Sequence, residues 1–356
     1  MSLIKNNNEV YIIAEIGQNH NGDIEICKKL IDQLDQYPYD EITGERLNKV
    51  NAIKLIKRDL EEEMSKEVLS RPYNSPNSFG KTYWEHREYL EFTYEQHVEL
   101  GKYIKSKGFD FVNSLCSPKT LRLIDEANID KVKIASKDLT NIPFLTELAE
   151  RKVPVIVSTG MASKEDLDAA IKIFEKANST DLSILHCISQ YPAEFSRLNL
   201  LSIKKLIDEY GDRYNIGYSD HSMGIHIPLA AVSLGAQIIE KHVTLDRSMK
   251  GTDHPVSANT SEIRQMTHDI RTLERSFGKY DIFRDEACLP NVIKLSKSLA
   301  TKINMKKGDK ITLDKLHLLS PGDGLKWTES DLKKVVNKTL NKDIEQNTII
   351  RLNDII

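Results

Sequence analysis

The sequence has few cysteines and no cysteine pair of the kind that holds a structural metal or a disulfide framework. Its four cysteines, Cys27, Cys116, Cys187 and Cys288, lie far apart with no CxxC spacing, which is typical of reduced thiols in the cytoplasm. No run approaches the ~20 apolar residues of a membrane span. The N-terminus, MSLIKNNNEVYIIAEIG, also lacks the apolar core of a signal peptide. We therefore expect a cytoplasmic protein with no membrane partner.

An excess of positive charge is also missing. Lys and Arg number 50 against 53 Asp and Glu, so the formal net charge is −3. Nucleic-acid binding depends on Lys and Arg that neutralise phosphates, so we expect no nucleic-acid partner. The 356 residues exceed the roughly 100–200 of an average domain, although α/β barrels commonly run to about 250 as one unit. One large domain followed by a small one is the expected organisation.

Short apolar runs alternate with longer amphipathic ones, which indicates βα repetition and a parallel sheet. Helical spacing of apolar residues is clear in Ile24–Leu34, Lys164–Lys176 and Leu200–Tyr210. Such repetition within about 250 residues predicts a closed (β/α)8 TIM barrel, with an open doubly wound sheet as the alternative. The expected strands are Val10–Ile16, Ala52–Ile56, Phe109–Ser114, Val132–Ala135, Val155–Ser158, Ser183–Cys187, Asn215–Tyr218 and Gln237–Glu240.

Two segments depart from the βα repeat. Residues 57–95 form a long connection rich in aromatics, which favours a lid over a solvated insertion with its own cluster around Tyr83, Trp84 and Phe92. After the barrel, short β-prone pieces separated by Gly and Asp predict a compact module that is marginal alone. We therefore expect a barrel domain at 1–280, a linker at 281–295 and a small domain at 296–356.

Two histidines, His221 and His242, stand at the ends of neighbouring strand-like runs, 242 − 221 = 21 residues apart. On adjacent parallel strands they would face one cavity, where an imidazole pair with open positions suits Mn, Fe, Co or Zn. Taken singly, His221 is more simply a capping residue and His242 a core histidine. The pair is more informative than either histidine alone, because four polar residues gather at the same strand ends: Ser219, Asp220, Glu240 and Asp253.

Buried charge is expected at several other strand ends. Glu15 shares a face with Ile13 and Gly17, so it points inward if that face lines the barrel. Lys54 and Lys133 lie inside apolar strands, where a lysine either binds an anion or forms a Schiff base. Short hydroxyls around the rim, each of which alone could be a cap or turn residue, suit a phosphate and a carboxylate: Ser114, Ser136, Ser158, Thr159, Ser189 and Ser219.

Together these motifs resemble the sialic acid synthase family, metal-dependent enzymes that condense phosphoenolpyruvate with an N-acylated sugar aldehyde. The C-terminal part resembles that family's antifreeze-like SAF domain, a β-clip fold. The segments that carry the resemblance are AEIGQNHNG (14–22), IKLIKR (53–58), RPYNSPNSFGKTYWEHREYLEF (71–92), KVKIAS (131–136), VSTGM (157–161), HCISQYP (186–192), IGYSDH (216–221) and EKHVTLDRSMKGTDH (240–254).

The resemblance implies a role for each candidate residue. His221 and His242 match metal ligands, with Mn²⁺ expected and Mg²⁺ or Co²⁺ as alternatives. Glu15, Glu240 and Lys133 match catalytic positions. Those that match the phosphoenolpyruvate site are Lys54, Ser114, Lys133, Ser136, Ser189 and Ser219, and those that match sugar contacts are Asp138, Tyr191 and Asp253. The family also implies a homodimer in which the small domain covers the partner's barrel mouth.

Three features depart from the family pattern. Leu55 and Ile56 replace a Phe-Gln pair, a charged insertion occupies 37–49, and Ser320 replaces an arginine before Pro-Gly. These departures leave open an acceptor of N-acetylmannosamine, its 6-phosphate, or a diamino-dideoxy sugar. Two other functions compete: a metal-independent Schiff-base aldolase or lyase using Lys133, and a non-catalytic protein that binds sugar phosphates.

Overall fold

The computed structural model describes residues 9–356, which divide into one compact unit ending at Gly278 and another spanning Lys279–Ile356. Residues 1–8 lie outside this description. They are part of the N-terminal segment for which the sequence predicted no signal peptide. In the described part of the chain, every helix is too short or too polar to cross a bilayer.

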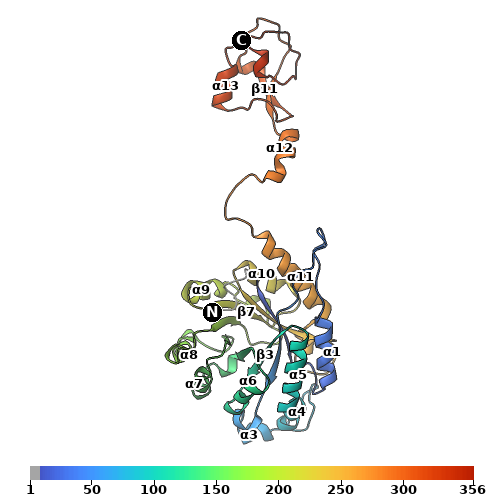
Figure 1. The fold of residues 1–356 in the computed structure, drawn as a ribbon, viewed down its shortest axis with the longest axis vertical. Coiled ribbons are helices and arrows are strands. Elements are labelled where there is room, and N and C mark those ends of the chain that lie inside the picture. The colour runs from blue at the N-terminus through green and yellow to red at the C-terminus, as the bar shows by residue number, and fades with distance from the viewer. Residues whose placement is uncertain (1–8) are drawn as a thin grey trace. The chain divides into compact units, whose positions relative to one another are not determined.

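The first unit is built around a closed parallel barrel (Figure 1). Each strand pairs with the next one in the sequence, and β8 pairs with β1 to close the ring. The (β/α)8 prediction is therefore confirmed, and the open sheet is wrong. The strands are β1 (Tyr11–Gly17), β2 (Ala52–Lys57), β3 (Asp110–Leu115), β4 (Lys131–Ile134), β5 (Val155–Ser158), β6 (Leu182–Cys187), β7 (Asn215–Asp220) and β8 (Ile238–Thr244), with a short β9 (Ala258–Asn259) beside β8.

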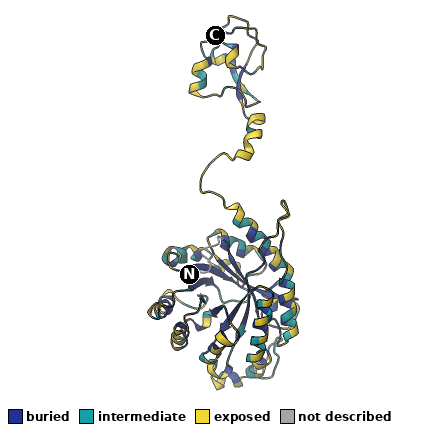
Figure 2. Cartoon of the chain, in the orientation of Figure 1, coloured by how far each residue is buried: buried dark blue, intermediate teal, exposed yellow. Residues whose placement is uncertain are grey.

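Helices surround the barrel and bury one face each, as the alternation of buried and exposed surface in Figure 2 shows. Several of them begin at a side chain that accepts backbone N–H groups, such as Asp23 for α1 and Ser163 for α8. The helices are α1 (Ile24–Leu34), α2 (Leu60–Glu63), α3 (Lys66–Ser70), α4 (Tyr83–Tyr89), α5 (Tyr94–Ser106), α6 (Leu123–Glu126), α7 (Ile142–Glu150), α8 (Lys164–Lys176), α9 (Ser202–Tyr210), α10 (His226–Ser233) and α11 (Thr260–Ser276).

The barrel interior consists of an apolar layer below a polar one. The apolar layer is formed by Tyr11, Ile13, Ala52, Val112, Ile156, Leu185 and Ile238. Because side chains alternate along a strand, the residues two positions further on form the next layer: Glu15, Lys54, Ser114, Ser158, Cys187 and Glu240. This layer lies toward the carboxyl ends of the strands, where barrel enzymes place their active sites.

Strand β8 is longer than the sequence predicted. The expected strand ended at Glu240, but β8 continues to Thr244. Lys241 faces away from the barrel axis, where its ammonium meets the Asp220 carboxylate at 2.6 Å. His242 therefore stands within the strand, two residues after Glu240 and on the same face.

The connection between β2 and β3 folds into α2, α3 and α4. Its aromatic cluster is composed of Tyr73, Phe79, Tyr83, His86 and Tyr89, with ring centroids 4.5 to 6.1 Å apart. Phe92, expected in this cluster, is instead buried in the barrel shell and stacks on His20 at 3.8 Å. The segment reaches the loop after β8, because the backbone N–H of Gly251 donates to Asn77.

The charged insertion 37–49 lies against α11, where Arg275 pairs with Asp40 at 3.2 Å and Glu45 at 3.1 Å. It connects α1 to the start of β2, at the amino ends of the strands. It is therefore at the opposite end of the barrel from the polar layer.

The second unit has its own small core around an antiparallel pair, β10 (Ser298–Thr301) and β11 (Leu316–Leu319), with α13 (Glu329–Val335). The core residues are Leu299, Met305, Ile311, Leu316, Val335, Leu340, Ile344 and Ile350. The segment predicted as a linker contains α12 (Leu289–Leu295). Ser320 is held to the end of α12, because its hydroxyl donates to the Leu295 carbonyl at 2.9 Å.

Candidate active site

A cavity of about 430 Å³ opens at the carboxyl ends of the barrel strands. Nearly every site residue predicted from the sequence lines this cavity, and these residues come from strands all around the barrel. These residues are Glu15, Lys54, Ser114, Lys133, Ser136, Ser189, Tyr191, Ser219, His221, Glu240, His242 and Asp253. Two candidates do not line it: Asp138, whose carboxylate pairs with Lys137 at 3.0 Å, and Thr159, whose hydroxyl donates to the Leu185 carbonyl at 3.3 Å.

Lys54 is the centre of the polar layer. Its ammonium lies 2.8 Å from Glu15 and 3.5 Å from Glu240, and it donates to the Ser114 hydroxyl at 3.2 Å. Ser219 donates to the other oxygen of Glu240 at 2.8 Å. All these side chains are buried, so the ion pairs act in a medium of low dielectric and fix one arrangement of the charges.

The two carboxylates differ in acidity. Burial raises the pKa of Glu15, and neighbouring Glu240 raises it further against the opposing effect of Lys54. Burial also acts on Glu240, but Lys54, Lys133 and the Ser219 hydroxyl outweigh it and lower the pKa of that carboxyl. Two carboxyl groups with separated pKa values provide one group that exchanges protons and one that remains ionised.

Lys133 differs from Lys54 because no carboxylate of the described chain lies within ion-pair distance of it. Its ammonium donates to the Ile134 carbonyl at 3.0 Å, and burial lowers the pKa of the amine although Glu240 opposes this. A buried cation of this kind needs an anionic partner. Lys133 is thus suited to an incoming anion.

Short side chains leave room near Lys133. The backbone N–H of Gly160 donates to the Ser136 hydroxyl at 3.0 Å. A methyl group on Gly160 would lie 2.5 Å from the Ser189 hydroxyl, and 2.9 Å from both the Ser136 hydroxyl and the Cys187 thiol. The buried Ser158 hydroxyl forms no hydrogen bond with any residue that the structure describes. This corner therefore offers space, hydroxyl donors and one cation, which together suit a phosphate.

The two histidines meet in the cavity, with ring centroids 5.4 Å apart. His221 Nδ1 contacts the Ile188 carbonyl at 2.9 Å, which orients the ring and leaves Nε2 free. Burial lowers the pKa of His242 well below its usual range, although Asp253 opposes this. Its Nδ1 is buried and has no hydrogen-bond partner in the described part of the chain. For His221 the effect of burial is outweighed by Cys187 and Ile188, which raise its pKa.

These observations fit a divalent cation with open coordination positions. An oriented imidazole and a neutral imidazole with an orphaned nitrogen are the donors that such a cation uses. Within residues 9–356 no group of three or more His, Cys, Asp or Glu is arranged to hold a metal, so the remaining positions would belong to substrate or water. Protons and the cation compete for His221, because its pKa is raised.

The sequence analysis missed several residues of the cavity wall. Tyr83 and Arg87 come from α4, and Glu63 and Met64 from the end of α2. The lid hypothesis for 57–95 pointed to this segment but not to individual side chains. Gln18, Arg58 and Lys137 follow strands β1, β2 and β4 and were equally missed. Ile56, noted as a departure from the family, also lines the cavity.

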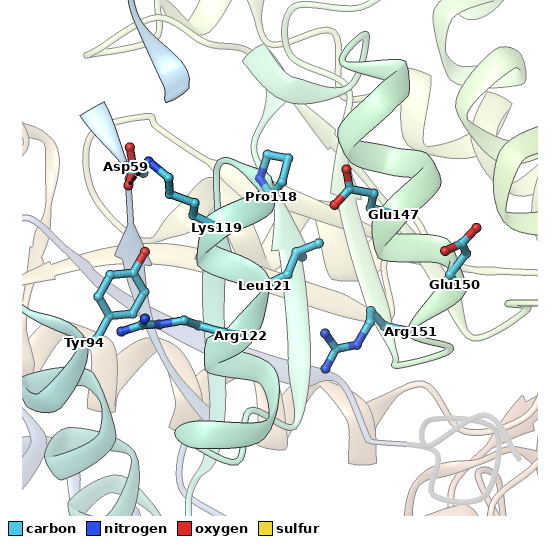
Figure 3. Close-up of a pocket in the computed structure, with 9 residues that line it drawn as sticks. All are labelled: Asp59, Tyr94, Pro118, Lys119, Leu121, Arg122, Glu147, Glu150 and Arg151. Atoms are coloured by element: carbon cyan, nitrogen blue, oxygen red, sulfur yellow. Dashed lines mark ion pairs between the residues drawn. The ribbon is translucent and has the colours of Figure 1, made fainter. Parts of the chain in front are cut away.

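A second hollow, of about 570 Å³, lies outside the barrel (Figure 3). It is lined by side chains from the start of α5, the turn before α6 and α7, and it contains no predicted site residue. Its cations have carboxylate partners: Lys119 with Asp59 at 3.5 Å, Arg122 with Glu126 at 3.4 Å, and Arg151 with Asp125. We assign it no function.

The fold and the cavity define a TIM-barrel enzyme whose site is equipped for anionic small molecules. Comparison with known proteins makes this specific. The profile of the NeuB family matches residues 45–281, and that of the SAF domain matches residues 296–356. The chain therefore belongs to the NeuB family of sialic and related nonulosonic acid synthases and carries a SAF domain, which confirms the resemblance seen in the sequence.

Similar proteins cover nearly the whole chain. It is 33% identical to the human N-acetylneuraminate-9-phosphate synthase over 96% of this chain and 91% of that protein. It is 31% identical to the N,N'-diacetyllegionaminic acid synthase of Legionella pneumophila, over 96% and 93%. The crystal structure of N-acetylneuraminic acid synthetase from Leptospira borgpetersenii, in complex with citrate, is 31% identical and superposes with a TM-score of 0.64 over 80% of this chain and 90% of that one.

Proposed function

We propose that this protein condenses phosphoenolpyruvate with an N-acylated amino-sugar aldehyde, forming a nonulosonic acid and releasing phosphate. The observation that carries the proposal is the meeting of Lys54, Glu15, Glu240 and the two imidazoles in one cavity. Simple binding of a sugar phosphate does not need two carboxylates of different acidity beside a candidate metal site.

The donor is assigned to the corner formed by Lys133, Ser136, Gly160 and Ser189. This corner supplies a cation without a carboxylate partner and hydroxyls that fit phosphate oxygens. Lys54 then faces the donor carboxylate. When the donor and the acceptor are held at a fixed distance, the entropic cost of bringing the two reactants together is met on binding rather than in the chemical step.

We propose that His221 and His242 hold a divalent cation, with Mn²⁺ expected and Mg²⁺ or Co²⁺ as alternatives. When bound, the cation supplies Lewis-acid stabilisation of charge that develops on the acceptor's carbonyl oxygen. Tyr191 lies over His221, with ring centroids 4.1 Å apart, and a tyrosine hydroxyl ionises only well above neutral pH. Its hydroxyl therefore stays protonated and donates to the acceptor. Asp253 accepts a sugar hydroxyl on the same side.

The carboxylates have separate roles. When C3 of phosphoenolpyruvate attacks the carbonyl carbon, positive charge develops at C2, and ionised Glu240 stabilises it. Water then adds at C2, and Glu15, whose pKa is raised, takes the proton of that water. The C2–O bond to phosphate then breaks as the added C2 hydroxyl gives up its proton and becomes a carbonyl, while the alkoxide formed from the acceptor's aldehyde takes up a proton.

The test is phosphate release from phosphoenolpyruvate with a panel of N-acyl hexosamines, measured after chelator treatment and after addition of each divalent metal. We expect His221→Ala and His242→Ala to lose metal-dependent release by at least about 100-fold, since metal catalysis supplies several kcal/mol. His226→Ala is the matched control, because His226 is exposed at the start of α10 and lies outside the cavity. Full activity of both cavity variants would refute the metal site.

One alternative enzymatic function depends on Lys133. Burial lowers the pKa of this lysine, and a neutral amine can form a Schiff base. A Schiff-base aldolase or lyase would be trapped by borohydride in the presence of pyruvate and would not need a metal. The synthase predicts no trapping and no turnover after chelation. Ligand binding with no phosphate release under any condition would favour a non-catalytic protein.

The family resemblance leads us to propose a homodimer as well. The small second unit has a core of few residues, and a domain of that size is marginal alone. A partner surface, such as the barrel mouth of a second copy, would stabilise it.

A further inference from the structure

We propose that Arg87, Tyr83 and Gln18 form a second anion subsite in the cavity, which binds a terminal phosphate on the acceptor sugar. This inference rests on the proposed condensation and names the class of its acceptor. The names of the relatives leave the matter open, since the human one is called a 9-phosphate synthase and the Legionella one is named for an acid without phosphate.

Arg87 is a cation of the cavity wall held in place by neutral groups. Its Nε donates to the Tyr83 hydroxyl at 2.8 Å, and its Nη1 donates to the Gln18 side-chain carbonyl at 2.7 Å. Its guanidinium also lies 5.0 Å from the centre of the Tyr83 ring. Two directional bonds to uncharged partners fix the position of the side chain without cancelling its charge.

Three donors at this place lack an acceptor. Gln18 is 8% exposed, yet its side-chain NH₂ has no hydrogen-bond partner among the described residues. Nη2 of Arg87 makes no hydrogen bond, and the hydroxyl of Tyr83, which accepts from Arg87, donates to no described group. A buried donor without a partner costs free energy. A phosphate offers three strong acceptor oxygens and would satisfy these donors together.

The other cations of the cavity are already paired, with one exception. Lys54 is matched by Glu15, Arg58 by Glu91 at 3.0 Å, and Lys137 by Glu63 at 2.8 Å. Among the cations that line this cavity, Lys133 and Arg87 are the two with no carboxylate of residues 9–356 within ion-pair distance. A neutral acceptor would leave Arg87 without an anion, whereas phosphoenolpyruvate and a phosphorylated acceptor together use both cations.

The two free cations lie on different sides of the barrel. Lys133 comes from β4, and the hydroxyl corner beside it follows β4, β5 and β6. Gln18 comes directly after β1, and Arg87 comes from α4. In the ring of strands, β1 lies opposite β5, between β8 and β2. The acceptor can therefore place its aldehyde near the imidazoles on β7 and β8 and its far end near Arg87.

Asp253 is a carboxylate of the same cavity that could make Arg87 structural. Burial acts to raise the pKa of Asp253, but His242 lowers it most, followed by the Thr252 hydroxyl, Arg58 and then Arg87. The two groups nevertheless lie beyond ion-pair distance, and Asp253 already accepts from Thr252 at 3.0 Å. A purely structural Arg87 would affect phosphorylated and unphosphorylated acceptors equally.

The experiment compares N-acetylmannosamine with its 6-phosphate in the wild-type enzyme, in Arg87→Gln and in Arg87→Lys. We expect the wild type to prefer the phosphorylated sugar, and R87Q to raise its KM by about 10- to 100-fold, the size of a lost charge-assisted hydrogen bond. The KM for phosphoenolpyruvate should stay within about twofold, because that donor binds elsewhere. R87K should recover part of the loss. Arg71→Gln, an exposed arginine of the same connection paired with Glu67, is the control.

Two results would overturn the subsite. One is a wild-type preference for the unphosphorylated sugar. The other is an R87Q variant that changes both acceptors equally or weakens phosphoenolpyruvate binding instead. If no acceptor gives phosphate release, the proposed condensation fails, and calorimetry with N-acetylmannosamine 6-phosphate still decides the subsite: binding that R87Q abolishes supports it, and no binding to wild type rejects it. Circular dichroism of R87Q confirms that it is folded.

Discussion

At the scale of single residues, Gly160 is the position where the cavity wall has least room for a side chain. The hydroxyls of Ser136 and Ser189 and the thiol of Cys187 converge on the place where a β-carbon would stand. Core atoms do not move far to admit an extra methyl group. The missing side chain thus preserves the space that we assign to the donor's phosphate.

Gly160→Ala should raise the KM for phosphoenolpyruvate by at least about tenfold while the KM for the acceptor changes little. The added methyl group would displace the Ser189 hydroxyl, which lies 2.5 Å from its position. Steady-state kinetics with each substrate varied separately measures this. In the double variant G160A/S189A the closest contact is gone, so part of the affinity should return. Equal changes in both KM values would contradict a donor site in this corner.

At the scale of elements, β7 and β8 are joined by a buried ion pair on their outer face. Lys241 and Asp220 are fully buried and lie 2.6 Å apart. Asp220 also accepts from the Tyr218 hydroxyl at 3.1 Å and from the backbone of Ser222 at 2.9 Å. Each partner is adjacent in sequence to one of the two cavity histidines. The pair therefore fixes how far apart the strands hold His221 and His242.

Lys241→Met should destabilise the barrel by about 3–5 kcal/mol, because it leaves the Asp220 carboxylate buried without its partner. Asp220→Leu combined with Lys241→Met should restore most of that stability, since an apolar pair of similar volume replaces the charges. Urea unfolding followed by circular dichroism measures both. A loss below about 1 kcal/mol, the size of an exposed ion pair, would contradict the structural role.

The order and number of the barrel strands could be predicted from the sequence, because each strand appears there as a short continuous run of apolar residues. The inward direction of Glu15, Lys54 and Glu240 followed from the alternation of side chains. The end of β8 could not be predicted, since Lys241 finds its partner on another strand. Gln18 and Arg87 were missed for a related reason: they are 87 − 18 = 69 residues apart, and only the packing of α4 against the end of β1 brings them together.

At the scale of the whole molecule, each of the two compact units has its own core. The barrel core contains most of the buried apolar residues, and the second unit depends on eight. The stability of the two units should therefore differ, and the smaller one gains most from any contact with another chain.

Light scattering coupled to size exclusion should give a mass near twice the 40.6 kDa of one chain. A chain that ends at Gly278, where the first unit ends, should keep the circular dichroism of the barrel but lose most of its activity if the partner's small domain covers the site. A monomer that is fully active at all concentrations would contradict the proposed dimer.

Closure of the barrel joins the beginning of the first unit to its end. Glu15 and His242 are neighbours across β1 and β8, although 242 − 15 = 227 residues separate them. During synthesis, β1 leaves the ribosome long before the strand that completes its surroundings. A nascent polypeptide that stops before Thr244 lacks a complete β8 and therefore a complete cavity. We expect the newly made chain to have no catalytic activity until β8 has left the ribosome.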